Sequence, residues 1–109
     1  MAKRDSLQGS LDLMVLKILS RRPRLHGYAI MTAIKEMSEQ VLSVEEGSLY
    51  PALHRMEEAG WIRAVWITND TGRRARIYDV TAVGRRQLTA EESRWAEVTD
   101  AVNRVLRMA

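Results

Sequence analysis

The residues best suited to chemistry lie between Glu46 and Ile62, in one predicted amphipathic helix. Its apolar residues recur three and four positions apart, which places them on one buried side: Leu49, Ala52, Leu53 and Met56. The opposite side carries hydroxyl, imidazole and guanidinium groups, together with a proline: Ser48, Tyr50, Pro51, His54 and Arg55. Such a set donates hydrogen bonds to anions and to polar edges. The pattern therefore predicts a helix built to contact a partner.

The inventory of reactive residues excludes the usual enzymes. The chain has two histidines, His26 and His54, and no cysteine. It has no glycine-rich phosphate loop, no pair of histidines at metal-binding spacing and no paired carboxylates in a perturbing setting. We therefore expect a protein that is not an enzyme, with no cofactor and no metal site.

The charge of the chain is segregated along the sequence. The formal net charge is +3, most of the positive charge is arginine, and the acids concentrate in 36–58 and 91–100. Segregation of this kind favours a basic face directed at an anion such as a phosphate backbone, the alternative being an ordinary solvated surface. No stretch approaches the about 20 apolar residues of a membrane span, so we expect a soluble, cytoplasmic protein with no membrane partner.

Three helices are predicted in the first half of the chain. Ser10 is expected to cap the first, which ends before Arg21. Its apolar stripe leaves Leu13 and Leu16 on a second face, to pack within the domain or against another subunit. The second helix is expected over about 26–38. The third is expected to begin near 46–48, because Pro51 is costly deep inside a helix, and to end at Gly60.

A hairpin and a long helix are predicted in the second half. The segments 61–67 and 73–80 read as strands joined by a turn over 68–72. Arg73, Arg74 and Arg76 lie near its tip, with the last two on one face. Thr81 is expected to cap a helix through Met108. Its apolar seam is narrow, although Glu91 interrupts it, and consists of Leu88, Trp95, Val98, Val102 and Val105.

Three helices followed by a two-stranded hairpin are the element order of a winged helix-turn-helix, an α+β fold that is mainly α. In that fold the third helix enters the major groove of DNA and the hairpin forms a wing beside it. Arg55 is then a candidate for a bidentate contact to guanine or for a phosphate contact. For Tyr50 the alternative is a ring packed on the second helix, and for His54 a solvated surface residue. The wing arginines are candidates for phosphate or minor-groove contacts, or for a charged strand surface.

The chain resembles the PadR family of prokaryotic transcriptional regulators over nearly its whole length. The resemblance is carried by Leu7-Gln-Gly-Ser-Leu-Asp-Leu-Met-Val-Leu16, His26-Gly-Tyr28, Gly47-Ser-Leu-Tyr-Pro-Ala-Leu-His-Arg-Met56, Gly72-Arg-Arg-Ala-Arg-Ile-Tyr78 and Val80-Thr-Ala-Val-Gly84. Each motif alone is weak, but their order and spacing are specific. The acidic pair Glu45-Glu46 departs from the small or proline residues that are more usual in the family at this position.

The resemblance implies a homodimer, usually a repressor, that reads an inverted repeat in double-stranded DNA. It adds Tyr28 to the DNA-binding candidates. It divides the chain into a DNA-binding part, 1–80, and a dimerisation helix, 81–109, whose seam packs against the partner with help from Leu13. Some members bind flat aromatic compounds at the dimer interface and release DNA. Leu13 and Trp95 are then candidates to hold such an effector, the alternative being that Trp95 only fills the interface.

The alternative function is that of a protein-interaction module. Some winged helices bind proteins and not DNA. The arginine-rich wing and the uncharged-to-basic face of the third helix favour DNA.

Overall fold

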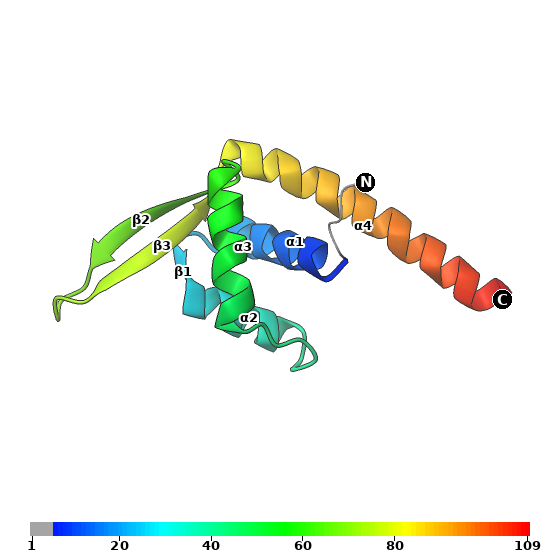
Figure 1. The fold of residues 1–109 in the computed structure, drawn as a ribbon, viewed down its shortest axis with the longest axis horizontal. Coiled ribbons are helices and arrows are strands. Elements are labelled where there is room, and N and C mark those ends of the chain that lie inside the picture. Colours follow the sequence, from blue (N-terminus) through cyan, green and yellow to red (C-terminus); the bar gives the residue numbers. More distant parts are fainter. Residues whose placement is uncertain (1–5) are drawn as a thin grey trace.

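The computed structural model describes residues 6–109 as four long helices and a small sheet (Figure 1). The elements, in chain order, are α1 Ser6–Arg21, β1 Leu25–His26, α2 Gly27–Met37, α3 Glu46–Glu58, β2 Ile62–Thr68, β3 Arg74–Val80 and α4 Ala82–Met108. The wing, formed by β2 and β3, and the far end of α4 point in opposite directions from the helical centre (Figure 1). The molecule is therefore elongated, with extents of 58 × 29 × 25 Å.

Helix α1 lies behind α3 and forms the middle of the core (Figure 1). The prediction that Ser10 caps this helix is wrong, because α1 already begins at Ser6 and Ser10 lies inside it. Leu16, expected off the apolar stripe, is fully buried in the chain's own core, because α1 packs against several elements and is covered on more than one face. Leu13 is only partly buried. Of the two leucines, only Leu13 is therefore left for another subunit.

Helices α2 and α3 form the helix-turn-helix. His26 caps α2, because its Nδ1 accepts a hydrogen bond from the Ala29 amide at 3.3 Å. Helix α3 begins at Glu46, as the position of Pro51 predicts, and no side chain caps its first turn. Gly60, with a φ of +80°, ends α3, and the Trp61 amide bonds back to the Met56 carbonyl at 3.0 Å. This left-handed glycine closes the helix where the sequence predicts it.

The sheet is antiparallel with strand order β1-β3-β2. Trp66 of β2 lies opposite Arg76 of β3, so the two side chains share one face. The turn is built on Asn69, whose Oδ1 accepts from the amides of Thr71 and Arg73, and on Gly72, whose φ is +84°. The predicted hairpin is confirmed. Strand β1 was not predicted, because two residues carry no periodic pattern.

Helix α4 starts as predicted, since the Thr81 hydroxyl accepts from the Gly84 amide at 3.0 Å. Leu88 is buried in the chain's own core, although it was predicted to contact a partner. Glu91 is only 6% exposed and accepts from Gln87 Nε2 at 2.8 Å and from Arg94 at 3.3 Å. Lys17 and Glu92, 3.0 Å apart, join α1 to the same part of α4. Beyond that point α4 leaves the core (Figure 1).

Candidate nucleic-acid interface

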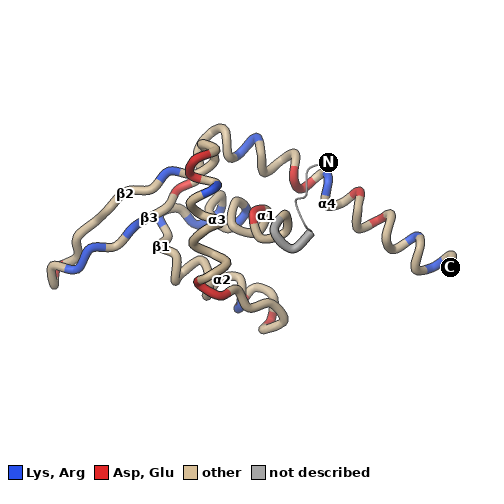
Figure 2. The backbone as a smooth tube through the Cα atoms, in the orientation of Figure 1, with Lys and Arg blue, Asp and Glu red and all other residues tan. Residues whose placement is uncertain are grey.

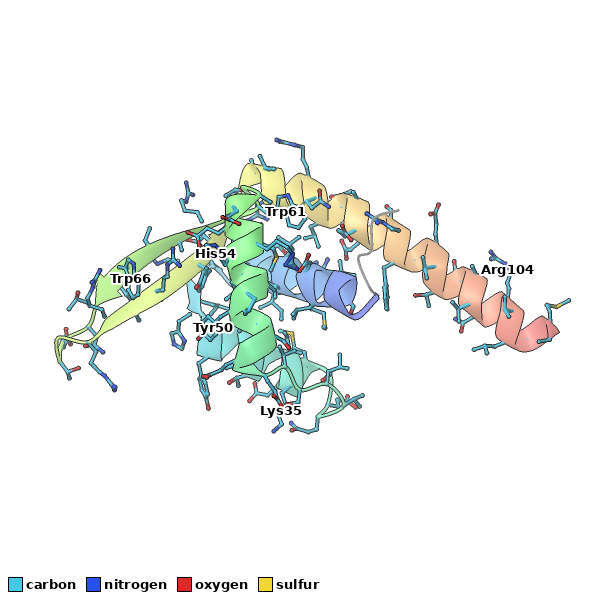
Figure 3. All side chains as sticks on the ribbon, in the orientation of Figure 1. Lys35, Tyr50, His54, Trp61, Trp66 and Arg104 are labelled. Carbon is cyan, nitrogen blue, oxygen red and sulfur yellow. The ribbon has the colours of Figure 1, made fainter. Side chains whose placement is uncertain are left out.

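Most of the polar face of α3 is exposed. Ser48, Pro51 and His54 are exposed, and Figure 3 shows Tyr50 and His54 along this helix beside the wing. His54 lies 3.5 Å from Glu58, one helical turn further on. A surface pair of this kind contributes little to stability, so His54 keeps its side chain available to a ligand.

Tyr50 packs on the start of α2. A Cβ atom added at Gly27 would collide with the hydroxyl and ring of Tyr50, so the absence of a side chain at Gly27 makes room for this ring. Tyr50 is nevertheless 42% exposed, and Tyr28 stands more exposed beside it. The ring of Tyr50 is therefore packed on the second helix, as its predicted alternative states, while part of the residue stays exposed.

Arg55 makes a strong contact inside the protein. Its Nη2 donates to the Asp12 carboxylate at 2.7 Å, and Asp12 is fully buried at 0% exposure. An arginine is well suited to this task because its guanidinium keeps its charge and donates in a fixed geometry. The residue expected to read guanine thus holds α3 against α1.

The three wing arginines have different surroundings. Arg73 is exposed and lies before β3. The Arg74 guanidinium lies over the Trp66 ring, 4.6 Å from its centroid. Arg76 Nη2 donates to Glu57 of α3 at 2.7 Å. Of the three, Arg76 is therefore the one that forms an ion pair within the described part of the chain, and this pair ties the wing to α3.

One groove joins the start of α2, α3 and the wing. We call it the wing groove; it has a volume of about 430 Å³ and is lined by His26, Gly27, Tyr28, Tyr50, Trp66, Arg74, Ala75, Arg76 and Tyr78. The basic residues of the wing gather along β3 and just before it (Figure 2), where Arg73, Arg74 and Arg76 lie. Burial raises the pKa of the Tyr78 phenol above its ordinary 10.0, and the nearby Arg76 opposes that rise. The floor of the groove is thus neutral and its rim is cationic.

A second groove lies between α1, the α2–α3 loop and α4. It has a volume of about 650 Å³, and its lining is Ser10, Leu11, Leu13, Met14, Leu42, Ser43, Val44, Glu45, Ser48 and Trp95. The structure thus brings Leu13 and Trp95, the two residues predicted for an effector, to one cavity. Trp95 is 49% exposed, and Val98, Val102 and Val105 of the same seam are exposed further along α4.

Among residues 6–109 no helix is long and apolar enough to cross a membrane. Within the same residues no group of three or more histidine or acidic side chains is placed to hold a metal ion.

Sequence reasoning missed two residues of this region. Asp12 lies in an apolar helix, and a carboxylate at such a position needs a buried partner, which is the signal that was available. Trp66 gave a weaker signal, since an aromatic residue in a strand is normally read as core.

The third helix, its bracing partner and the basic hairpin together define a winged helix-turn-helix protein of the DNA-binding class. Solved structures share this fold. A transcriptional regulator from Clostridium thermocellum matches with a TM-score of 0.83 at 23% identity, covering 95% of this chain and 97% of that one. A PadR-like transcriptional regulator from Bacillus cereus matches with a TM-score of 0.77 at 29% identity, covering 94% and 97%.

The sequence comparisons agree with the fold. An uncharacterized protein of Lysinibacillus sphaericus is 26% identical over 103 residues, which is 94% of both chains. Residues 15–90 match the Transcriptional regulator PadR-like family. The chain belongs to this family, which is one of transcriptional regulators and not of enzymes, and membership implies DNA binding. The predicted family and fold class are thereby confirmed.

Proposed function

We propose that the protein is a homodimeric repressor that reads an inverted repeat through α3 and the wing. The observation that carries this is the wing groove, because α2, α3 and the basic wing border it together. Ser48, Pro51 and His54 then face base edges in the major groove, while Tyr28 and Tyr50 lie at its side. Arg73 and Arg74 contact the phosphate backbone or the minor groove, while Arg55 and Arg76 hold α3 in position.

The dimer is supported by the unpartnered seam of α4. Trp95, Val98, Val102 and Val105 are about half exposed or more and recur at the spacing of a narrow helical stripe. Burying them against a second copy removes apolar surface from water. With Leu88 assigned to the core, the partner contact begins at Trp95 and includes Leu13. A two-fold pair would place its recognition helices about 34–36 Å apart, in successive major grooves.

A small aromatic effector is supported by the groove that Leu13 and Trp95 share. Its volume of about 650 Å³ is within the usual range of ligand sites, and most of its lining is apolar. The competing role for Trp95 is to fill the dimer interface. A variant in which Trp61 and Trp66 are replaced by Phe retains Trp95 as its tryptophan. Titrating this variant with aromatic compounds and following the fluorescence of Trp95 distinguishes the two roles. Unchanged Trp95 fluorescence with every compound would exclude the effector.

Binding to the DNA upstream of the protein's own coding region, followed across a salt series, tests the proposed function. A dimer that contacts six or more phosphates should lose about 10³-fold in affinity between about 50 and 200 mM salt. Footprinting should show two protected half-sites. Light scattering should give the mass of a dimer. A single chain in solution and on DNA, or an affinity that does not change with salt, would instead favour a winged helix that binds a protein. As a DNA regulator it would act in the cytoplasm.

A further inference from the structure

Trp66 is an exposed tryptophan that the fold does not require. It is 56% exposed and does not belong to the hydrophobic core, whereas the ring of Tyr78 on the same face of the sheet is buried. A tryptophan buries more apolar area than any other side chain when it packs. Its exposure on a strand of the wing therefore calls for an explanation outside folding.

The contacts of Trp66 indicate that its ring positions the side chain of Arg74. Arg74 stacks over its ring at 4.6 Å, and Arg76 lies at 5.8 Å. Arg76 is neutralised by Glu57, while Arg74 has no acidic partner among residues 6–109. The ring thus holds a guanidinium whose charge is not compensated within the described chain, and it reduces the number of positions that this long side chain samples.

The position of Trp66 and Arg74 fits the sugar–phosphate backbone of a DNA duplex. This step depends on the proposed function. In B-form DNA a single sugar–phosphate strand separates a major groove from the minor groove beside it. If α3 occupies the major groove and the wing tip reaches the minor groove, this strand must pass between α3 and the wing. Trp66 and Arg74 line the wing groove together with Tyr50. Figure 3 shows Trp66 on the wing and Tyr50 on α3.

We propose that Trp66 is a DNA-contacting residue whose ring packs on a deoxyribose and positions Arg74 on the adjoining phosphate. Tyr28 and Tyr50 form the opposite wall of the same groove. The chemistry is complementary, because the sugar offers an apolar face and the phosphate a negative charge. Contacts of this type position the protein without reading sequence. The partner recognised here is the DNA backbone, so random and specific duplexes should be affected alike.

The test combines Trp66→Ala and Arg74→Ala in a double-mutant cycle, with a random-sequence duplex several helical turns long as the probe. Trp66→Ala should weaken binding by about fivefold per subunit. Arg74→Ala should weaken binding and lower the salt slope by about 0.9 per subunit. In the Trp66→Ala background, Arg74→Ala should cause a smaller loss of DNA-binding affinity, because the ring no longer positions the arginine. Arg73→Ala is the matched control. It should cause the same loss of DNA-binding affinity with Trp66 present as in the Trp66→Ala variant.

Two readouts separate binding from folding. Trp66→Phe keeps a ring face and should retain part of the affinity that Trp66→Ala loses. In a Trp61→Phe, Trp95→Phe variant, the fluorescence of Trp66 should change when the duplex is added, and acrylamide should quench it less. Unchanged fluorescence on DNA that is demonstrably bound, or full affinity in Trp66→Ala, would overturn the role of Trp66 while leaving the proposed function intact. Failure of the unaltered protein to bind any duplex would overturn the proposed function itself.

Discussion

The buried carboxylate of Asp12 accepts a hydrogen bond from Nη2 of Arg55 at 2.7 Å, and this pair joins α1 to α3. Asp12 has no exposed surface, while the Arg55 side chain is partly exposed. Arg55 therefore supplies a positive charge directly to this buried carboxylate. Arg55, which the sequence makes a candidate for a guanine or phosphate contact, thus also holds α3 against α1.

We predict that Arg55→Ala lowers the free energy of unfolding by about 3 kcal/mol, because it removes a charged hydrogen-bond partner from a buried carboxylate. Urea unfolding followed by circular dichroism measures this. His54→Ala is the matched control on the next residue, and it should change stability by less than about 0.5 kcal/mol.

The paired variant Asp12→Leu, Arg55→Met makes this prediction sharper. The double variant removes the buried carboxylate together with its Arg55 partner, so it should be more stable than Arg55→Ala alone. If Arg55→Ala is as stable as the unaltered protein and loses only DNA discrimination, then Arg55 is a base reader and the pair with Asp12 is incidental.

The wing arginines should separate into two classes. Arg76→Ala should lower stability by about 1 kcal/mol, because Glu57 of α3 then loses a charge-assisted hydrogen bond of 2.7 Å in a partly exposed setting. Arg73→Ala should leave thermal unfolding unchanged and weaken binding to every DNA sequence alike. Thermal melts and gel shifts on the same two variants measure both effects. If Arg73→Ala lowers stability and Arg76→Ala affects only DNA binding, then Arg73 has the structural role.

The sequence predicted the elements better than the contacts between them. Residue spacing, Gly60 and Thr81 placed the third and fourth helices, because these signals are local to the chain. Asp12 and Arg55 are 43 positions apart, and no local pattern can pair them. Leu88 was assigned to the dimer seam for a similar reason, since periodicity identifies an apolar stripe but not the surface that covers it. The fold brings its part of α4 down onto α1.

In the candidate site, too, the sequence predicted the residue types but not the contacts between elements. The residue types on the face of α3 and on the wing predicted a nucleic-acid surface. Which arginines are engaged within the protein depends on Asp12 and Glu57, whose positions follow only from the packed fold. For Trp66 the sequence predicts only a position in a strand, because its exposure depends on where the wing extends beyond the core.

The junction between the wing and α4 predicts a sharp difference between two glycines. A Cβ atom at Gly84 would collide with the Trp61 carbonyl oxygen, and it would lie 2.8 Å from Cγ2 of Val80. Gly84→Ala must therefore displace the start of α4, and we expect a loss of stability of about 2 kcal/mol. Because the direction of α4 would change with it, the preferred half-site spacing of a dimer should also change.

Gly47→Ala is the matched control for Gly84→Ala. Nothing lies within 4 Å of its added Cβ, and Gly47 sits in the first turn of α3. The helix should gain up to about 0.5–1 kcal/mol from the replacement. Differential scanning calorimetry of both variants measures the contrast. Equal melting temperatures for the two would show that the contact of Gly84 with Trp61 does not constrain α4.

The raised pKa of Tyr78 predicts a loss of stability at alkaline pH. Its phenol is buried, and desolvation raises its pKa above the ordinary 10.0. Below about pH 10 the phenol is protonated in both folded and unfolded chains, so the stabilisation from its burial is fully present. As the pH rises further, the unfolded chain ionises first. The stability contributed by Tyr78 should then fall by up to about 1.4 kcal/mol per pH unit, until the folded phenol also ionises.

Tyr78→Phe isolates this effect from the other groups that titrate at high pH. The phenylalanine keeps the buried ring and has no proton to lose. The difference in unfolding free energy between the two proteins should therefore be constant below about pH 10 and should shift in favour of Tyr78→Phe above it. Urea unfolding across this range, with phenolate absorbance recorded in parallel, measures both quantities. Parallel stability curves at all pH values would show that the Tyr78 phenol ionises as readily in the folded protein as in the unfolded chain.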